Sequence, residues 1–136
     1  FGLEEQTAAV FDDDGFFKTG DIGRHDADGH LHITGRLKEM LIIGGENVFP
    51  REVEDLLHDR EDIVEVAVVG VPDEGWGERL RAYVVPAAGG AAGEDELKEY
   101  VRENLARYKV PREIVFVDEL PRNATGKILK KDLARD

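Results

Sequence analysis

Cysteine is absent from this sequence of 136 residues, which excludes disulfide frameworks, thiolate zinc sites and a cysteine nucleophile. Long apolar runs are absent too, since no stretch approaches the roughly 18 residues that a membrane-spanning helix requires. Residues 1–10 lack the basic-then-apolar order of a signal peptide. We therefore expect a cytoplasmic protein without a transmembrane segment, whose chemistry comes from carboxylates, amines, histidine or backbone groups.

Positive charge is scarce, because 18 Lys and Arg stand against 30 Asp and Glu, for a net charge of −12. This balance argues against nucleic acid as a partner, since domains that neutralise phosphates carry a basic face. Residues 105–136 are the exception, with eight basic and five acidic side chains. This end could bind a small polyanion, or it could be a solvated amphipathic segment.

Residues 16–21 and 30–35 indicate two short strands joined by the turn-rich stretch 26–29. An isolated hairpin is barely stable in water. This one carries more apolar side chain than two strands can hide, at Phe11, Phe16, Phe17 and Ile22. We therefore expect a piece of a longer protein, whose sheet these strands complete. On its own, this part is expected to be poorly ordered or paired edge to edge in a dimer.

The remaining residues can hold one modest core and predict an α+β fold, with a β-hairpin and a three-stranded sheet packed by helices. Pro50 fits the first position of a helix, and residues 63–71 are nearly all β-branched, as in a strand buried on both faces. The other expected elements are a hairpin over 40–49 that turns at 44–47, paired strands over 63–71 and 80–85, a loop over 86–93, a helix with apolar positions 97, 100, 101 and 105, a strand over 113–117 and a short helix over 128–135.

The run Pro121-Arg122-Asn123-Ala124-Thr125-Gly126-Lys127 superficially resembles a phosphate-binding loop, but it is not one. Such a loop needs glycine at position 121 and Ser or Thr at position 128, which are Pro and Ile here. What remains is a loop that turns at a glycine and presents one lysine. Its ammonium can reach a developing charge on phosphate or carboxylate, although a solvated surface lysine is the commoner case.

Other positions have an ordinary explanation beside a functional one. The pair Gly44-Gly45 permits close approach of a ligand or makes a hairpin turn. Asp21 can bind a sugar diol or simply complete a turn. Trp76, the only tryptophan, either covers a ligand or caps the core.

Metal binding is not expected. His30 and His32 share one face of a predicted strand, but no third ligand of clear identity accompanies them. The acidic turn 26–29 is not a calcium loop either, because Leu31 occupies the position that requires glycine.

Four motifs together resemble the adenylate-forming superfamily of acyl-CoA synthetases, luciferases and peptide-synthetase adenylation domains, over essentially the whole chain. They are Phe17-Lys18-Thr19-Gly20-Asp21, Gly35-Arg36-Leu37-Lys38-Glu39, Gly44-Gly45-Glu46-Asn47-Val48-Phe49-Pro50-Arg51-Glu52-Val53-Glu54 and the run 121–127. The resemblance implies a large N-terminal domain with the acyl pocket and the phosphate loop, and a small mobile C-terminal domain. On this basis, residues 1–36 are the last strands of the large domain and residues 37–136 are the mobile domain.

For adenylation, the resemblance implies that Asp21 binds the ATP ribose hydroxyls and that Arg36 contacts ribose or phosphate. Lys38 matches the hinge, which is aspartate in some members. Lys127 resembles the catalytic lysine that bridges the substrate carboxylate and the α-phosphate, where its charge offsets that of the pentavalent transition state. Mg²⁺ is expected with ATP, held by the large domain.

For transfer to CoA, the resemblance implies a rotation of the small domain that removes Lys127 and brings another face inward. The hairpin tip at Gly44, Gly45 and Glu46 would then line the pantetheine tunnel beside Trp76. The CoA nucleotide would be contacted by Tyr108, Lys109 and Arg112.

The sequence therefore predicts part of an AMP-forming ligase that joins a carboxylic acid, such as a fatty acid, to CoA, and the chain alone is expected to be inactive. The motif Gly-Gly-Glu-Asn-Val-Phe-Pro resembles that of acyl-CoA and aryl-CoA ligases more than that of peptide-synthetase adenylation domains, and this resemblance favours CoA over a carrier-protein thiol as acceptor. The alternatives are a luciferase-like enzyme, an aryl-CoA ligase and a free-standing domain that binds a nucleotide or partner.

Overall fold

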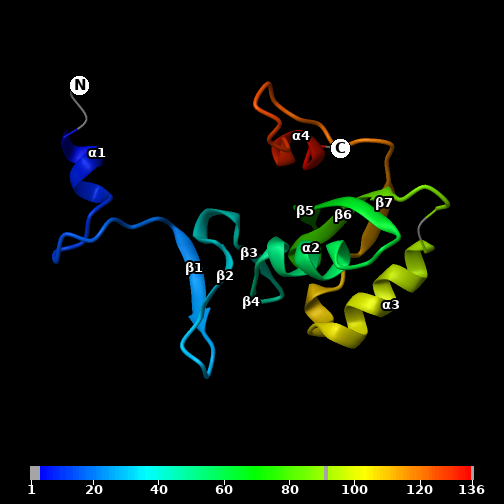
Figure 1. The fold of residues 1–136 in the computed structure, drawn as a ribbon, viewed down its shortest axis with the longest axis horizontal. Helices are drawn as coiled ribbons and strands as arrows, with labels where there is room; N and C mark the ends of the chain where they lie inside the picture. The colour runs from blue at the N-terminus through cyan, green and yellow to red at the C-terminus, as the bar shows by residue number, and fades with distance from the viewer. Residues whose placement is uncertain (1–3, 91, 136) are drawn as a thin grey trace.

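The computed structural model describes residues 4–90 and 92–135 and shows a body built on one small sheet, with an N-terminal arm beside it (Figure 1). The helices are α1 (Glu4–Ala9), α2 (Pro50–His58), α3 (Glu94–Asn104) and α4 (Lys130–Leu133), and 3-10 turns lie at Leu37–Glu39 and Arg107–Lys109. The strands are β1 (Asp21–His25), β2 (Leu31–Arg36), β3 (Leu41–Ile43), β4 (Glu46–Val48), β5 (Ile63–Asp73), β6 (Gly77–Pro86) and β7 (Glu113–Phe116). The expected α+β fold is confirmed.

The central sheet has the order β5-β6-β7. Strands β5 and β6 form an antiparallel hairpin in which Val68 is the partner of Ala82, as the predicted pairing requires. Strand β7 runs parallel to β6. Because a parallel neighbour needs a crossover connection, α3 lies between these two strands in the sequence.

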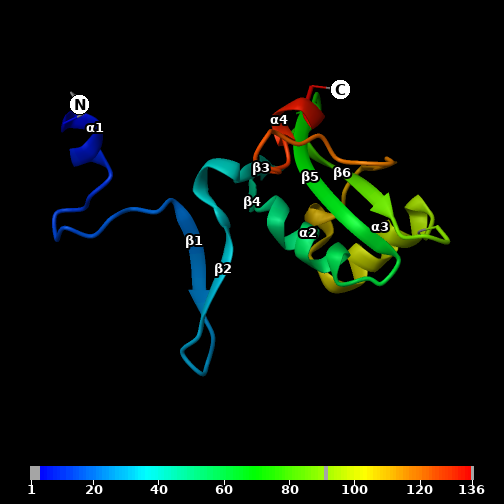
Figure 2. The same ribbon diagram turned by 45° about the horizontal axis from the view of Figure 1, so that its top comes forward.

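Both faces of the central sheet are covered, as the β-branched run over 63–71 predicted. Val66 and Val68 point to one face and pack in a core with the buried sides of α2 and α3. Val69 and Tyr83 point to the other face and pack with the segment that ends in α4. Figure 2 shows α2 and α3 on one side of the sheet and α4 on the other. The short helix α4 replaces the longer one expected over 128–135.

Helix α2 begins at Pro50, as predicted, after Phe49 in an extended conformation. Val53 and Leu57 lie four residues apart on the helix and are fully buried. The opposite side of α2 is charged, and Arg51 lies 3.5 Å from Asp55 on it. This charged side faces the groove described below.

The β3–β4 hairpin turns on two glycines, rather than on the four residues 44–47 that the sequence indicated. Gly44 (φ +59°) and Gly45 (φ +86°) adopt the left-handed conformation that a two-residue type I′ turn requires. Glu46 and Asn47 already pair with β3. The tighter turn brings Gly44 to the very tip of the hairpin.

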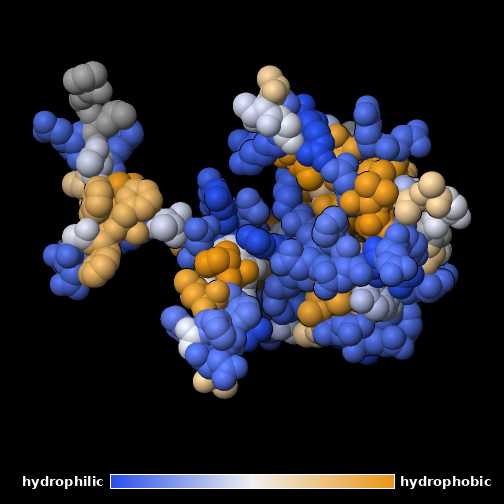
Figure 3. Space-filling model, in the orientation of Figure 1, coloured by the Kyte–Doolittle hydropathy of each residue, from blue (hydrophilic) through white to orange (hydrophobic). Residues whose placement is uncertain are grey.

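The N-terminal arm, residues 4–36, extends away from the body, which it touches where Gly35 packs against Phe49, and it keeps much apolar surface exposed (Figures 1 and 3). Phe16 is 72% exposed and Phe17 is 59% exposed. The strand expected over 16–21 is wrong for most of its length, because pairing with β2 begins only at Asp21. Phe17 instead forms an isolated bridge with Phe11 and packs edge-on against its ring.

Helix α1 and the two 3-10 turns were not expected from the sequence. None of the helices in the described part of the chain is long and apolar enough to cross a bilayer.

Candidate functional site

Asp21 and Arg36 are direct neighbours across the β1–β2 ladder. Arg36 Nε lies 3.3 Å from Asp21 Oδ1, and both side chains are partly exposed. The pair sits where the arm joins the body, because Leu37, directly after β2, donates its N–H to the carbonyl of Gly20 at 2.8 Å. The structure therefore places the two predicted nucleotide ligands side by side.

Lys38 lies in the 3-10 turn that follows β2 and is exposed. With Arg36, Leu37, Thr19 and Gly20 it lines a hollow of about 430 Å³. The predicted hinge position thus lies in a short exposed turn, where a change of backbone dihedral angles would disturb few packed side chains.

Lys127 stands on an exposed loop that has a fixed internal shape. Asn123 donates its N–H to the carbonyl of Lys127 at 2.9 Å. The side-chain Oδ1 of Asn123 accepts hydrogen bonds from the N–H groups of Thr125 (3.0 Å) and Lys127 (2.9 Å). Gly126 has φ +83°, which other residues rarely adopt. The loop therefore holds its backbone rigidly and leaves the Lys127 side chain free to meet a ligand.

Lys127 and Arg36 line one groove of about 310 Å³ between the arm and the body. Its remaining lining residues are Glu39, Arg51, Glu54 and Asp55. All three carboxylates that line the groove have cationic partners, since Asp55 pairs with Arg51, and Glu54 and Glu39 lie 2.7 and 3.7 Å from Lys130 Nζ. The groove therefore brings together the predicted adenylation lysine and the predicted nucleotide arginine, which are far apart in the sequence.

Trp76 lies against the tip of the β3–β4 hairpin. A Cβ added to Gly44 would come 2.5 Å from Trp76 Cε3, so the ring and the glycine are in direct contact. Trp76 is 56% exposed and does not cap the core. Asp73 Oδ1 accepts the Trp76 N–H at 3.0 Å, and Asp73 Oδ2 lies 3.6 Å from Arg112 NH1. Three predicted CoA residues thus form one connected surface: Gly44, Trp76 and Arg112.

Lys109 is already bound within the chain, which the sequence did not indicate. Its Nζ donates to both Glu52 carboxylate oxygens, at 2.9 and 2.8 Å, and lies 5.9 Å from the centre of the Tyr108 ring. Lys109 is therefore part of the packing between the 3-10 turn over 107–109 and helix α2. The other predicted CoA residues, Gly45 and Glu46, are exposed on the hairpin.

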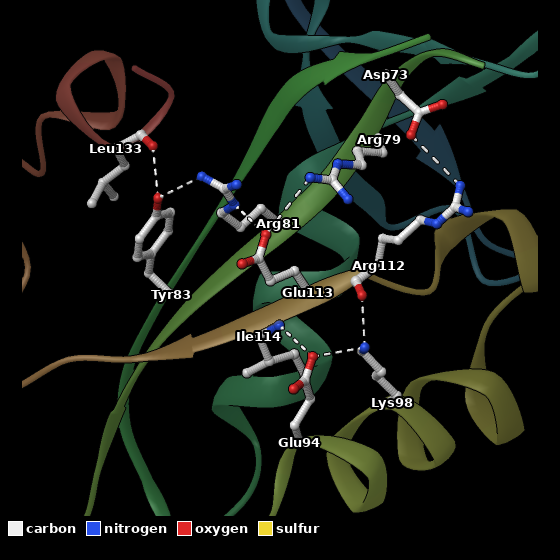
Figure 4. A network of polar contacts seen from close by, with 10 residues as sticks. All are labelled: Asp73, Arg79, Arg81, Tyr83, Glu94, Lys98, Arg112, Glu113, Ile114 and Leu133. Carbon is white, nitrogen blue, oxygen red and sulfur yellow. Dashed lines mark hydrogen bonds and ion pairs between the residues drawn. The ribbon is translucent and has the colours of Figure 1, made fainter. Parts of the chain in front are cut away.

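A network of polar contacts joins β7 to its neighbour β6 and to helix α3 (Figure 4). Glu113 accepts a hydrogen bond from Arg81 Nε at 2.7 Å. Glu94 accepts one from Lys98 and one from the N–H of Ile114, and both lower the pKa of its carboxyl group. Lys98 also donates to the carbonyl of Arg112 at 2.6 Å. The backbone at Arg112 is therefore held firmly while its guanidinium reaches Asp73.

The acidic turn after β1 is closed by Asp26. Its Oδ1 accepts the N–H groups of Asp28 and His30, and its Oδ2 lies 2.7 Å from His32 Nε2. These hydrogen bonds lower the pKa of the Asp26 carboxyl group, and the one with the His32 ring has the largest effect. His30 lies in the turn before β2, so the strand face expected to carry both histidines does not form. Ligand atoms of Asp26, Asp28 and His30 lie within 4.8 Å of one another, but the turn itself accounts for Asp26.

Sequence reasoning missed the residues that hold the Lys127 loop to the body. Arg122 bonds to Glu65 on β5, and Lys130 bonds to Glu54 on α2. Glu54 also accepts the N–H of Val68 on the free edge of β5, at 2.7 Å. The only signal in the sequence was the position of both basic residues within a few residues of Lys127.

Comparison with known proteins gives consistent results. A family model described as the AMP-binding enzyme C-terminal domain matches residues 52–127. An indoleacetate–CoA ligase of Aromatoleum aromaticum is 49% identical over 128 residues, which are 94% of this chain and 25% of that protein. The long-chain-fatty-acid–CoA ligase FadD13 of Mycobacterium tuberculosis is 48% identical over 126 residues, 93% of this chain and 25% of that protein.

The structure of the amide bond synthetase McbA of Marinactinospora thermotolerans is similar over 98% of this chain and 27% of that one, with 40% identity and a TM-score of 0.90. The chain spans about a quarter of the length of the curated relatives it matches. Fold, motifs and family model agree, and the chain belongs to the family of AMP-binding enzyme C-terminal domains.

Proposed function

We propose that the chain is the mobile C-terminal part of an AMP-forming ligase that joins a fatty or aryl acid to CoA. Residues 1–36 would close the sheet of the large domain, and residues 37–136 would move about Lys38. The observation that carries this proposal is the groove that Lys127 and Arg36 both line. The names of the relatives support CoA ligation, because an indoleacetate and a long-chain fatty-acid ligase match almost the whole chain.

In the first half-reaction, a carboxylate oxygen of the acid attacks the α-phosphorus of ATP and pyrophosphate leaves. The Lys127 ammonium would lie between the two reacting groups and offset the charge that develops between them. Asp21 would accept the ribose hydroxyls, and Arg36 would contact ribose or phosphate beside it. The groove carboxylates Glu54 and Asp55 are paired with cations. They therefore suit Mg²⁺ poorly, and Mg²⁺ would enter with ATP on the large domain.

In the second half-reaction, the CoA thiolate attacks the acyl carbonyl and AMP leaves. Gly44, Gly45 and Glu46 would line the pantetheine path beside Trp76, and Tyr108, Lys109 and Arg112 would meet the CoA nucleotide.

Helix α2 separates the two candidate surfaces. Arg51 faces the Lys127 groove, while the next residue, Glu52, faces Lys109. Successive residues on a helix point about 100° apart. One active centre could not easily meet both sides of α2 at once, which supports rotation of the domain between the half-reactions.

An amide-forming ligase is a second candidate, because the similar McbA structure is that of an amide bond synthetase. Both candidates use the same first half-reaction and differ in the acceptor, a thiol or an amine. The surface formed by Gly44 and Trp76 favours CoA, since an exposed indole beside a glycine turn offers an apolar wall for the thin pantetheine arm.

The test uses the full-length protein, which we expect in the cytoplasm. ATP–pyrophosphate exchange is measured over a panel of carboxylic acids for wild type and Lys127→Ala, and thioester formation from supplied acyl-adenylate is measured separately. We expect exchange to collapse in the variant while thioester formation persists. Unchanged exchange would show that Lys127 is only a surface lysine. Amide formation without thioester formation would favour the second candidate, and light emission would indicate a luciferase-like enzyme.

A further inference from the structure

Arg122 connects the Lys127 loop to the central sheet. Its NH1 donates to the carbonyl of Gly126 at 2.6 Å, directly before Lys127. Its NH2 bonds to the Glu65 carboxylate on β5. One guanidinium therefore holds both the peptide that precedes Lys127 and a strand of the body.

The loop needs such a connection. Its internal bonds, centred on Asn123, fix its shape but do not fix its direction relative to the sheet. At its base, Leu129 donates its N–H to the carbonyl of Pro121 at 2.8 Å, and Arg122 pairs with Ile128. The outer part of the loop would otherwise be free to tilt about this base.

A tilt of the loop would move the Lys127 ammonium. A displacement of about 1 Å from the reacting atoms can cost about 100-fold in rate. The lysine stem is itself flexible, so the backbone carbonyl before it is the point at which the protein can set its direction.

We propose that Arg122, held by Glu65, is the positioning residue for Lys127 in adenylation. This inference rests on the proposed function of Lys127. Arg122 acts through the Gly126 carbonyl and is not a ligand of the nucleotide, because both terminal nitrogens are engaged within the chain. A surface ion pair without this role would contribute little to stability. Removal of Arg122 therefore lowers the rate of adenylation if Arg122 positions Lys127, and changes little if it forms only a surface ion pair.

The experiment uses the full-length protein and four variants: Arg122→Ala, Glu65→Gln, the double variant and Lys127→Ala. The matched control is Arg102→Ala, because Arg102 forms a similarly exposed ion pair with Glu99 on α3, away from the loop. The readouts are kcat and KM of ATP–pyrophosphate exchange, thioester formation from supplied adenylate, and the unfolding temperature.

We expect Arg122→Ala to lower kcat of exchange about 10- to 100-fold, with KM for ATP and acid changed less than about 3-fold. Thioester formation and the unfolding temperature should match those of Arg102→Ala. Glu65→Gln should give a smaller loss of the same kind, because the bond to Gly126 remains. Adding it to Arg122→Ala should cause no further loss, since both act through one contact.

Three results would overturn the inference. They are an unchanged kcat in Arg122→Ala, equal losses in both half-reactions, and losses from Arg122→Ala and Glu65→Gln that multiply in the double variant. If Lys127→Ala itself leaves exchange intact, the proposed function fails first and this inference falls with it. If Lys127→Ala abolishes exchange but Arg122→Ala does not lower it, only the positioning role fails.

Discussion

Trp76 packs directly on Gly44, so that even a methyl group at position 44 would come 2.5 Å from the indole. The two residues belong to different hairpins, β3–β4 and β5–β6. Gly44 also requires φ +59°, which a side chain would strain. The glycine therefore serves both the turn and the contact, and the indole forms one wall of the proposed pantetheine path.

Gly44→Ala should push the indole away from the hairpin tip. In the full-length protein, we expect thioester formation from supplied adenylate to fall at least about 10-fold while ATP–pyrophosphate exchange stays within about 2-fold, because the Lys127 groove is untouched. In the isolated chain, Trp76 fluorescence reports the displacement, since this is the only tryptophan of the 136 residues. Gly89→Ala, in the loop after β6, is the matched control with positive φ. Equal loss in both half-reactions would contradict the assignment.

Lys109→Ala should lower stability as well as any affinity for CoA. Glu52 would lose both hydrogen bonds from Lys109 and remain partly buried, at a cost of about 1 to 3 kcal/mol in the free energy of unfolding. Urea unfolding measures this cost. Glu52→Gln weakens the same ion pair but leaves Lys109 in place, so a comparison of the two variants separates the packing role of Lys109 from a contact with CoA. If KM for CoA rises equally in both variants, Lys109 acts by packing and does not touch CoA.

Lys130→Ala should loosen the C-terminal segment. Glu54 would keep its bond from the Val68 N–H but lose its cation, at a cost of about 1 to 3 kcal/mol. Thermal unfolding should show the loss, and hydrogen exchange should quicken over residues 128–135. Lys131→Ala is the control, because Lys131 is exposed and next in sequence. Equal effects of the two substitutions would argue that the Glu54 contact contributes nothing.

The stability of the chain should fall in acid, partly through Asp62. Hydrogen bonds from the Arg60 guanidinium, and then from the Ala92 N–H, hold the pKa of Asp62 well below its usual range. A depressed native pKa means that the unfolded chain binds the proton first. The stabilisation is thus complete above about pH 4 and is lost as the pH falls through the native pKa.

Urea unfolding at pH 6, 4 and 3 measures this dependence. We expect Asp62→Asn to be less stable than wild type at pH 6 and to lose less on acidification. Asp118→Asn, an exposed carboxylate of the same charge, is the control. A pH slope in Asp62→Asn equal to that of the control would contradict the assignment.

The isolated chain should associate through its N-terminal arm, because Phe16, Phe17 and Leu31 are exposed there beside free strand edges. Sedimentation velocity over a range of concentrations measures the association. The double substitution Phe16→Ser and Phe17→Ser should shift the chain towards monomer. A monomer that resists proteolysis of the arm at every concentration would refute both pairing and disorder.

Local patterns in the sequence predicted most of the body. Pro50 starts α2 because a residue without an N–H suits the first turn of a helix. The β-branched run over 63–71 forms a strand covered on both faces because such side chains pack well on a pleated surface. Elements without a strong pattern were missed or misplaced. The strand expected over 16–21 is one case, since its apolar residues have no sheet here to pair with.

The sequence by itself determined most elements of the body and the order of the motifs, because each depends on neighbours within a few residues. The resemblance carried by these motifs then singled out Lys127 as the candidate catalytic residue. Only the tertiary structure decided which of these residues meet. The contacts of Gly44 with Trp76, of Arg122 with Glu65 and of Lys109 with Glu52 join segments at least 32 positions apart. No local propensity encodes such contacts, because they form only when the sheet and α2 have packed and fixed the distances between their surfaces.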